Sequence, residues 1–381
     1  MGLHWGLNPL RYLVPEDILS HIESTQVDPH VPTSDNDRLP MINGQTGDMI
    51  IEIKSSKFYR LRRDKFRRML MGGIDIRWGK KITNVSYSDD KLTVTAKFED
   101  GTSDTGSILV ATDGPHSKVR TLLVGEEAAK VTPIDFASTM CFTQHTREHA
   151  LYLRAKPHNP LYQVAPHPEG CCAWLSLHDG DDKEHPENWT FFHYISFPEP
   201  REEINTRSNR EHIAHQKAMA RKFVDPWRSV FEWMPDDMDV WYSKLRNWDP
   251  SLPEHAWDNR AGRVTLAGDA AHPMTFQRGQ GLNHALQDSF TVCKAIEEFW
   301  GSRDEGEAAL IQKRTDALAS YEAEMKARAG EEVRLSGENS LAMHDWSLLS
   351  KSPSLTKGMI LSRTCIRCAA LSFRAKKAVA Y

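Results

Sequence analysis

The chain has 381 residues, with 48 Lys and Arg against 52 Asp and Glu, which gives a formal net charge of −4. At about 150 residues per domain this length predicts two domains, three, or one large domain with insertions. The 40% hydrophobic and 26% charged residues argue against wholesale disorder. The near-neutral charge gives no reason to expect nucleic acid as a partner, and no stretch reaches the roughly 20 apolar residues of a membrane span.

Targeting signals and cysteines give a second set of limits. The first residues lack the charged start and apolar run of a secretory signal, and six cysteines are too few for a disulfide scaffold. Cys365 and Cys368 form one CxxC pair, but no second pair completes a zinc site, and the histidines show no metal spacing. We therefore expect no metal, and a reducing, cytoplasmic location.

The chain begins with helical segments and then changes to a strand. Pro15 followed by two acids is typical of a helix start. Met49–Ile53 predicts a strand, and the basic stretch Tyr59–Leu70 repeats its apolar residues at helical spacing.

The next segment alternates apolar and polar residues as strands do. Asp75–Trp78 and Lys91–Phe98 both show this pattern. Phe98–Thr102 is a turn signal, which predicts a hairpin between the second of these strands and Ser107–Ala111. A helix is expected to begin at Ser117.

Between residues 131 and 248 the pattern predicts a largely antiparallel sheet. Clusters of Pro, Gly and Asp separate the candidate strands, and an amphipathic helix is expected over Arg210–Phe223. The strands are expected at Met140–Gln144, Leu161–Val164, Cys172–Leu177 and Trp189–Ile195.

The last third predicts a buried strand and long helices. Val264–Ala267 predicts the strand, and a long helical region follows through Glu332, with good helix formers from Glu305 to Arg328. We expect domain boundaries near residues 130, 248 and 345. Residues 1–130 and 249–345 then form two parts of one domain, 131–248 the inserted sheet, and 346–381 a helical tail.

The strongest chemical signal lies between Val264 and Asp288. A buried strand ends at Gly268, and Asp269 follows at the carboxyl edge, where open α/β sheets bind ligands. An acid there can accept hydrogen bonds from sugar hydroxyls. Gly279–Asn283 then places backbone N–H groups at a helix start, which favours an anion or an electron-rich ring. The simpler reading is a strand-turn-helix corner capped by Asp269. The complete run in this order favours a ligand site.

A second signal is Leu109–Arg120, in which a strand runs into Asp113-Gly114 and a helix opens at Ser117. This turn places Asp113 near a sheet edge. Alone it would be an ordinary turn, but its position ahead of the first signal favours a shared site.

These two runs resemble the FAD-dependent aromatic-hydroxylase-like monooxygenases, similar to p-hydroxybenzoate and salicylate hydroxylases and in particular to the fungal members that modify secondary metabolites. The resemblance implies that Asp269 contacts FAD, that the Leu282 backbone faces the isoalloxazine ring, and that Asp113 lies near FAD and the nicotinamide cofactor. An arginine opening a helix reaches the FAD pyrophosphate in that family, and Arg63 is the best match, ahead of Arg60 and Arg62. The implied cofactor-binding residues are Arg63, Asp113, Gly268, Asp269, Gly279, Gly281, Leu282 and Asn283.

The family's first element is missing from this sequence. Members begin with a strand, a GxGxxG turn and a helix that holds the FAD pyrophosphate, whereas Met1–Asn8 resembles the text that follows that unit. We therefore expect an α/β (α+β) fold: an N-terminally truncated Rossmann-like FAD-binding domain with an inserted, mostly antiparallel substrate sheet and C-terminal helices. A truncated gene product or gene model, impaired FAD binding, or completion by another chain each accounts for the gap.

The resemblance implies a monooxygenase that uses FAD, NAD(P)H and O₂ to insert one oxygen atom into a small organic substrate, in secondary-metabolite biosynthesis. The alternatives are a non-catalytic remnant and an FAD oxidase or epoxidase on the same fold. We expect the substrate between the 131–248 sheet and the Gly279–Asn283 turn. Strand aromatics are more often core than pocket; those that could line the site are Tyr162, Trp174, Phe192 and Tyr194. The sequence nominates no catalytic side chain.

Overall fold

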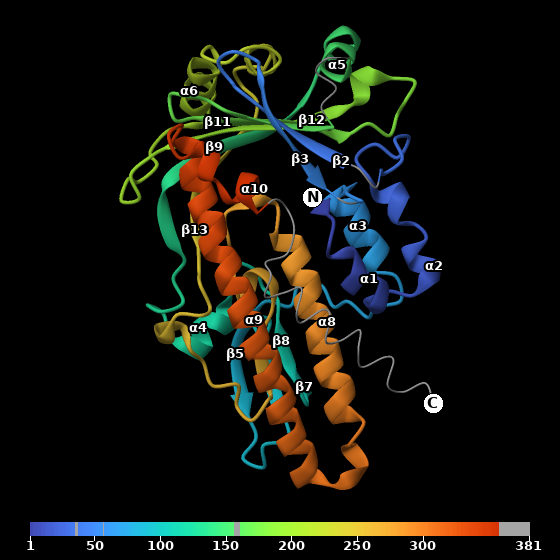
Figure 1. Ribbon diagram of the computed structural model, residues 1–381. Coiled ribbons are helices and arrows are strands. Elements are labelled where there is room, and N and C mark those ends of the chain that lie inside the picture. Colours follow the sequence, from blue (N-terminus) through green and yellow to red (C-terminus); the bar gives the residue numbers. More distant parts are fainter. Residues whose placement is uncertain (35–36, 56, 156–160, 358–381) are drawn as a thin grey trace.

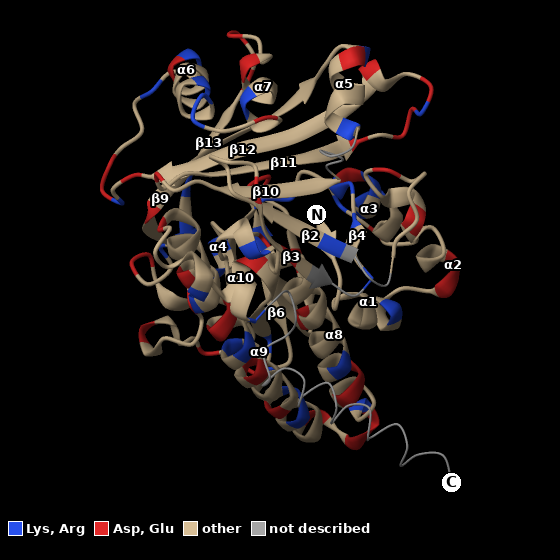
Figure 2. Ribbon diagram, turned by 45° about the horizontal axis from the view of Figure 1, so that its top comes forward, with Lys and Arg blue, Asp and Glu red and all other residues tan. Residues whose placement is uncertain are grey.

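The computed structural model describes residues 1–34, 37–55, 57–155 and 161–357. A seven-stranded sheet lies at one end of the molecule, and two long helices, α8 (Gly281–Trp300) and α9 (Glu307–His344), run away from it (Figure 1). In Figure 2 the strands are mostly free of charged residues, while acidic and basic residues alternate over the helices and loops around them.

The seven-stranded sheet is antiparallel except where β10 pairs with β2. Because successive side chains of a strand point to opposite faces of the sheet, alternate residues form one face, and this face packs against helices. From one edge to the other the strands are β13 (Trp241–Asn247), β9 (Thr132–Gln144), β12 (Thr190–Pro198), β11 (Cys172–Asp179), β10 (Tyr162–Pro166), β2 (Asp37–Ile42) and β3 (Met49–Ser55).

Three helices cover the outer face of this sheet: α5 (Arg147–Arg154), α6 (Asn209–Ala220) and α7 (Trp227–Glu232). Helix α6 begins with a capping box between Ser208 and Glu211. Buried residues of all three helices join Leu175, Phe191 and Ile195 of the strands in one apolar core. The opposite face is turned toward α9 and the rest of the chain.

The second core lies between a parallel strand pair and the two long helices. Strands β8 (Leu109–Ala111) and β14 (Val264–Leu266) pair in parallel, and their apolar side chains pack with residues of α8 and α9. Among the described residues this parallel sheet consists of β8 and β14 alone. A three-stranded antiparallel sheet lies beside it, formed by β5 (Ile82–Tyr87), β6 (Val94–Phe98) and β7 (Ser103–Gly106).

The remaining elements are short. Strand β1 (Gly2–Leu3) pairs antiparallel with β4 (Tyr59–Arg60), and the first helices pack there in a third apolar cluster. The α-helices are α1 (Leu7–Leu13), α2 (Glu16–Leu19), α3 (Arg63–Leu70), α4 (Lys118–Val124) and α10 (Pro353–Thr356). The 3-10 helices are η1 (Ile22–Thr25), η2 (Pro186–Asn188), η3 (Pro253–His255), η4 (Gly268–Ala270), η5 (Phe276–Arg278), η6 (Arg303–Glu305) and η7 (Leu349–Lys351).

The α/β fold class is confirmed, and most predicted elements form near their expected places. The strand predicted at Asp75–Trp78 is wrong: the segment is a loop that ends in a turn at Trp78, whose side chain is 64% exposed. No described strand pairs with it, so its alternation has no buried face to fill.

The predicted hairpin has a different second strand. The turn after Phe98 leads into β7, whose four residues are all exposed, so β6 pairs with β7 and not with the predicted Ser107–Ala111. Because β7 has no apolar alternation, its pattern gave no strand signal. The apolar residues of β8 instead complete the parallel pair with β14.

Two further points concern the predicted boundaries. The seven-stranded sheet includes β2 and β3, which precede residue 60, and the sequence pattern did not place them there. The domain boundaries stay a prediction.

Cys365 and Cys368 lie outside the described residues, as does most of the predicted helical tail. Within the described residues no cluster of metal-ligand side chains occurs, and no helix is long and apolar enough to cross a membrane.

Candidate functional site

The site is built around the turn that follows β14. Gly268 has a φ of +59°, a left-handed conformation that glycine adopts without strain. Its N–H donates to Asp288 Oδ2 of α8 at 2.8 Å, which fixes the turn on the helix. Asp269 is exposed, and its carboxylate has no hydrogen bond or ion pair within the described part of the chain.

A buried polar cluster supports this turn from below. Asp288 also accepts from His272 at 2.6 Å and from Arg328 at 2.7 Å, and Arg328 Nη1 lies 2.8 Å from His284 Nδ1. Burial by itself raises the pKa of Asp288, but the neighbouring His272 and Arg328 outweigh it and hold that pKa well below its usual value. Asp288 is therefore an ionised anchor shared by the turn, α8 and α9.

The glycine bend lies directly beside Asp269. Gly279 adopts a φ of +64°, and α8 begins at Gly281. A Cβ atom on Gly281 would lie 3.8 Å from Asp269 Oδ1, so the exposed carboxylate sits against the first turn of the helix. The first N–H groups of an α-helix have no intrahelical acceptor, and those of Gly281, Leu282 and Asn283 are therefore available at this point.

The side chains of Leu282 and Asn283 have other partners. Asn283 Oδ1 accepts from the N–H of His4 at 3.0 Å and of Gly6 at 3.1 Å, and its Nδ2 donates to the Gly2 carbonyl at 3.1 Å. Leu282 packs into the apolar cluster of the first helices. Both residues can therefore meet a ligand at the corner only through their backbone.

The second predicted acid lies at the same sheet edge. Strands β8 and β14 are adjacent and in register, with Ala111 opposite Leu266, so Asp113 and Asp269 follow neighbouring strand ends. Asp113 accepts from the Ser117 hydroxyl at 2.5 Å and from the Lys118 N–H at 2.7 Å. Its carboxylate is thus used to hold the start of α4.

Arg63 stands apart from this corner. It is the first residue of α3, is exposed, and makes no hydrogen bond or ion pair with any described residue. Arg62 pairs with Asp64 and Asp179, and Arg60 donates to the Ser176 hydroxyl. Arg63 is consequently the free guanidinium of the three, although it does not line the cavity beside Asp269.

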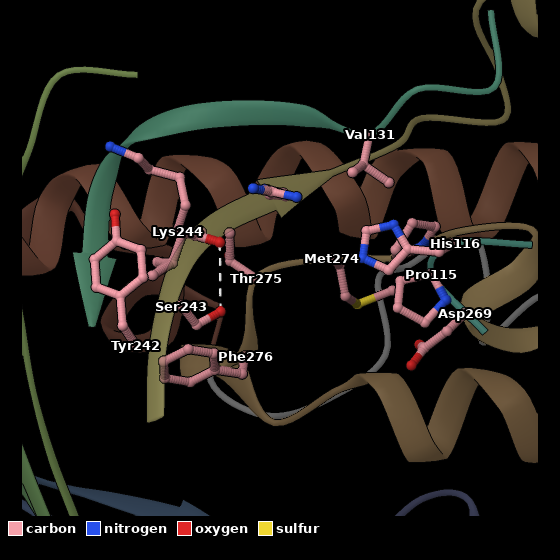
Figure 3. Close-up of a pocket in the computed structure, with 13 residues that line it drawn as sticks. Pro115, His116, Val131, Tyr242, Ser243, Lys244, Asp269, Met274, Thr275 and Phe276 are labelled. Atoms are coloured by element: carbon pink, nitrogen blue, oxygen red, sulfur yellow. Dashed lines mark hydrogen bonds between the residues drawn. The ribbon is translucent and has the colours of Figure 1, made fainter. Parts of the chain in front are cut away.

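A cavity of about 360 Å³ opens beside Asp269, between the loop after β8 and the edge strand β13. Figure 3 shows Pro115, His116 and Asp269 gathered at one end and Tyr242 with Lys244 at the other. The lining residues are Pro115, His116, Val131, Tyr242, Ser243, Lys244, Leu245, Arg246, Asp269, Pro273, Met274, Thr275 and Phe276.

One wall of the cavity is fixed by a buried charge network that the sequence gave no reason to expect. Glu199 accepts from Lys244 Nζ at 2.8 Å, from Arg207 Nη1 at 3.0 Å and from the Tyr242 hydroxyl. Burial and the Glu199 carboxylate both raise the pKa of Tyr242, so its phenol stays neutral and donates. The run Tyr242–Arg246 is the part of the sequence that forms this wall, and it was not predicted as a strand.

The four strand aromatics form a row along the inner face of the sheet. Trp174 lies parallel to Tyr162 and to Tyr194, with ring centroids 6.2 Å apart in each case. Tyr162 and Tyr194 are buried, in line with a core role, and none of the four lines the cavity. Tyr194 reaches it only through Phe276, edge to face at 5.0 Å.

Comparisons with known proteins agree with this geometry. The family model described as "FAD binding domain" matches residues 60–336. The FAD-dependent monooxygenase cctM of Talaromyces islandicus is 37% identical over 94% of this chain and 86% of its own. The FAD-dependent monooxygenase phnB of Penicillium herquei is 33% identical over 94% and 85%.

Solved structures share the fold at low sequence identity. Klebsiella pneumoniae HpxO complexed with FAD and uric acid has a TM-score of 0.69 at 17% identity, covering 94% of this chain and 83% of that one. A salicylate hydroxylase substrate complex has a TM-score of 0.65 at 16% identity, covering 100% and 88%.

Proposed function

Because the chain belongs to the FAD-dependent monooxygenases of the FAD binding domain family, we propose that it inserts one oxygen atom from O₂ into a small organic substrate, with NAD(P)H as reductant. We also propose a role in secondary-metabolite biosynthesis, in keeping with the fungal relatives. HpxO, a structural neighbour, has been solved with a small molecule, uric acid.

The residues of the corner fit FAD, and the observation that carries the proposal is the exposed Asp269 carboxylate, which no described residue binds. Asp269 would accept hydrogen bonds from the ribityl hydroxyls, and Gly281 leaves room beside it because it has no side chain. The free N–H groups at the start of α8 would face the electron-rich edge of the ring. Arg63 would reach the pyrophosphate as a paired donor.

When bound, FAD supplies the electron transfer and the activation of O₂. The chain's own residues have to orient the substrate and keep water away from the reaction. Val131, Met274 and Phe276 give the cavity an apolar lining, while Lys244 is held in place by Glu199. Rigid walls of this kind favour the positioning of a substrate.

Flavin content tests the cofactor site. Asp269→Ala should reduce the flavin absorbance per chain by about tenfold, because one to two charge-assisted hydrogen bonds are lost. Asp304→Ala is the matched control, since Asp304 is an exposed acid in η6 at the far end of α8. Equal flavin content in the two variants would reject the assignment of Asp269.

Labelled oxygen tests the reaction. Turnover under ¹⁸O₂ with NADPH should place one ¹⁸O atom in the product and the other in water. An oxidase would instead release both as hydrogen peroxide and leave the product unlabelled. A chain that stays colourless after addition of FAD would favour the non-catalytic remnant.

We also propose a cytoplasmic location, on the state of the cysteines. Cys141, Cys171, Cys172 and Cys293 are all free thiols in the structure, and the first three are buried. Free buried thiols are typical of proteins that live in a reducing compartment.

A further inference from the structure

The bend Gly279–Asn283 is attached to the rest of the chain on two sides. On one side the Asn283 side chain binds residues 2–6, and Trp5 Nε1 donates to Gln280 Oε1 at 2.9 Å. On the other side lies α9, which contacts the short helix η5 that leads into the bend. Because glycine backbones adopt many conformations, these attachments decide which path the bend takes.

The contact with α9 that lies nearest the bend is an ion pair between Arg278 and Glu332. Arg278 is the last residue of η5 and directly precedes Gly279. Its Nε donates to Glu332 Oε1 at 2.6 Å, and its Nη2 donates to Oε2 at 3.4 Å. The two residues are 3% and 5% exposed. A guanidinium that meets a carboxylate with two nitrogens is fixed in orientation as well as in position.

The same face of α9 binds the loop before Arg278. Glu332, Ser336 and Ser340 are spaced four residues apart and therefore lie along one side of the helix. The Thr275 hydroxyl donates to the Ser336 carbonyl at 2.8 Å, and the Ser340 hydroxyl donates to Thr275 Oγ1 at 2.8 Å. The Ser336 hydroxyl in turn donates to Glu332 Oε1 at 3.2 Å. The chain from Thr275 to Arg278 thus follows α9 up to the start of the bend.

Burial makes this ion pair sensitive to the loss of either partner. Arg278 Nη1 is buried and has no hydrogen-bond partner among the residues that the structure describes, so the guanidinium depends on Glu332. Burial raises the pKa of Glu332, and the charge of Arg278 acts against this rise. In a buried pair the cost of desolvation offsets much of the attraction, whereas removal of one partner leaves the other charge buried and uncompensated. The clearest effect of the pair is therefore on where the chain runs.

We propose that Arg278 and Glu332 are positioning residues of the cofactor site: their ion pair holds the Gly279–Asn283 bend in the conformation that binds FAD. The proposal rests on the function proposed above, which requires FAD at this corner. Both side chains act through the backbone of the bend. An ordered bend loses less conformational freedom when the cofactor binds, and preorganisation of this kind raises affinity. Breaking the pair should therefore weaken FAD binding while Asp269 and the N–H groups of α8 are still present.

The test is the dissociation constant of FAD for the purified full-length chain, measured by quenching of flavin fluorescence. We expect Glu332→Gln to weaken FAD binding about tenfold, because Arg278 loses its charged partner. Arg278→Lys should weaken it about threefold, since an ammonium keeps the charge but not the two-nitrogen contact. The absorbance bands of bound FAD should also shift in Glu332→Gln, because the ring then meets a bend of different shape. A loss of stability alone would leave these bands in place.

The ion pair between Arg154 and Asp28 provides a matched control. Arg154 Nη2 lies 2.7 Å from Asp28 Oδ2, and the two side chains are 15% and 10% exposed. This pair joins α5, on the outer face of the seven-stranded sheet, to the segment after η1. Asp28→Asn should lower the urea midpoint about as much as Glu332→Gln does, and should bind FAD as the wild type does.

A second measurement requires no cofactor. The His284 N–H donates to the Gln280 carbonyl at 3.1 Å, so its hydrogen exchange reports on the bend. In the flavin-free chain Glu332→Gln should speed exchange at His284, whereas Asp28→Asn should not.

The outcomes distinguish the inference from the function on which it rests. Unchanged FAD affinity in Glu332→Gln refutes the positioning role, and so does an equal loss of affinity in Asp28→Asn. Unchanged exchange at His284 in Glu332→Gln refutes it as well. A wild-type chain that binds no FAD would contradict the proposed function, but the exchange result would still decide whether the ion pair holds the bend.

Discussion

The turn after β8 and the turn after β14 are built alike, but the aspartate has a structural role only in the first. Both follow parallel strands, both contain a glycine with positive φ beside an aspartate, and both lead toward a helix. Asp113 is bonded to Ser117 and Lys118 at the start of its own helix, whereas the Asp269 carboxylate has no partner among the residues that the structure describes. In the second turn Asp288 holds the backbone in place of the local acid. A strand-end carboxylate becomes available to a ligand when another residue takes over its structural role.

The largest loss of stability should come from replacing Asp288, the residue that holds the turn after β14. Asp288→Asn leaves Arg328 with one charged partner, Glu324, and weakens the bonds to Gly268 and His272. We expect a loss of about 3 kcal/mol in the free energy of unfolding, measured by urea denaturation. Asp304→Asn should stay within about 0.5 kcal/mol. A similar small loss in Asp288→Asn would remove the contrast between the two turns.

Buried imidazoles make the sheet sensitive to pH in a range where Asp288 stays ionised. Burial lowers the pKa of His193 to about 3 and that of His344 to about 4. Both lie below the unfolded value of about 6.5, so protons favour the unfolded chain. Stability should be complete above pH 6.5 and fall toward pH 4, by up to about 1.4 kcal/mol per pH unit for each group.

Urea denaturation at pH 7, 6 and 5 measures this slope, and His344→Gln should make it shallower. The Asp288 carboxylate affects stability in a lower pH range. Because the folded pKa of Asp288 is depressed, its contribution is present above about pH 4 and is lost only at lower pH. A wild-type stability that is flat between pH 7 and 5 would contradict the neutral imidazoles.

Removing each of the two acids in turn should give smaller but more specific effects. Asp113→Ala should cost about 1–2 kcal/mol, since it removes the hydrogen bonds that hold the start of α4. Asp269→Ala should cost less than about 0.5 kcal/mol and reduce flavin content instead. Denaturation and visible absorbance on both variants measure the two effects. The comparison fails if Asp113→Ala loses flavin at unchanged stability.

The smallest effect is expected at the helix cap itself. The Ser117 hydroxyl accepts from the Arg120 N–H at 2.9 Å, as an N-cap does. Ser117→Ala should lower the free energy of unfolding by about 1 kcal/mol, and Ser117→Thr should restore most of it. Thermal denaturation is sufficient to measure both. Equal losses in the two variants would show that the hydroxyl is not the cause.

The corner was predictable because its residues are close in sequence. Strand, glycine, acid and helix start follow one another within β14 to α8, and local preference alone orders them. The capping role of Ser117 was readable for the same reason. Local pattern could not say which acid would be free, because Asp288 reaches Gly268 from 20 residues away.

The charged wall of the cavity could not be predicted from the sequence, for a different reason. Glu199 and Lys244 are 45 residues apart, and they meet only because β13 pairs with β9 at the sheet edge. Arg246 follows a register shift in the pairing of β13 with β9, and such a shift depends on that pairing and cannot be recognised in the sequence. Asp75–Trp78 shows the reverse error, in which a clear alternation finds no neighbouring strand.

The attachment of Asn283 to residues 2–6 has a consequence for the order of events during synthesis. The backbone N–H groups of His4 and Gly6 bind Asn283, which is synthesised some 280 residues later. Contacts of such long range form slowly, because a large loop must close first. The start of α8 can thus be completed only after the chain has been synthesised as far as Asn283, so this corner assembles later than contacts formed within residues 1–280.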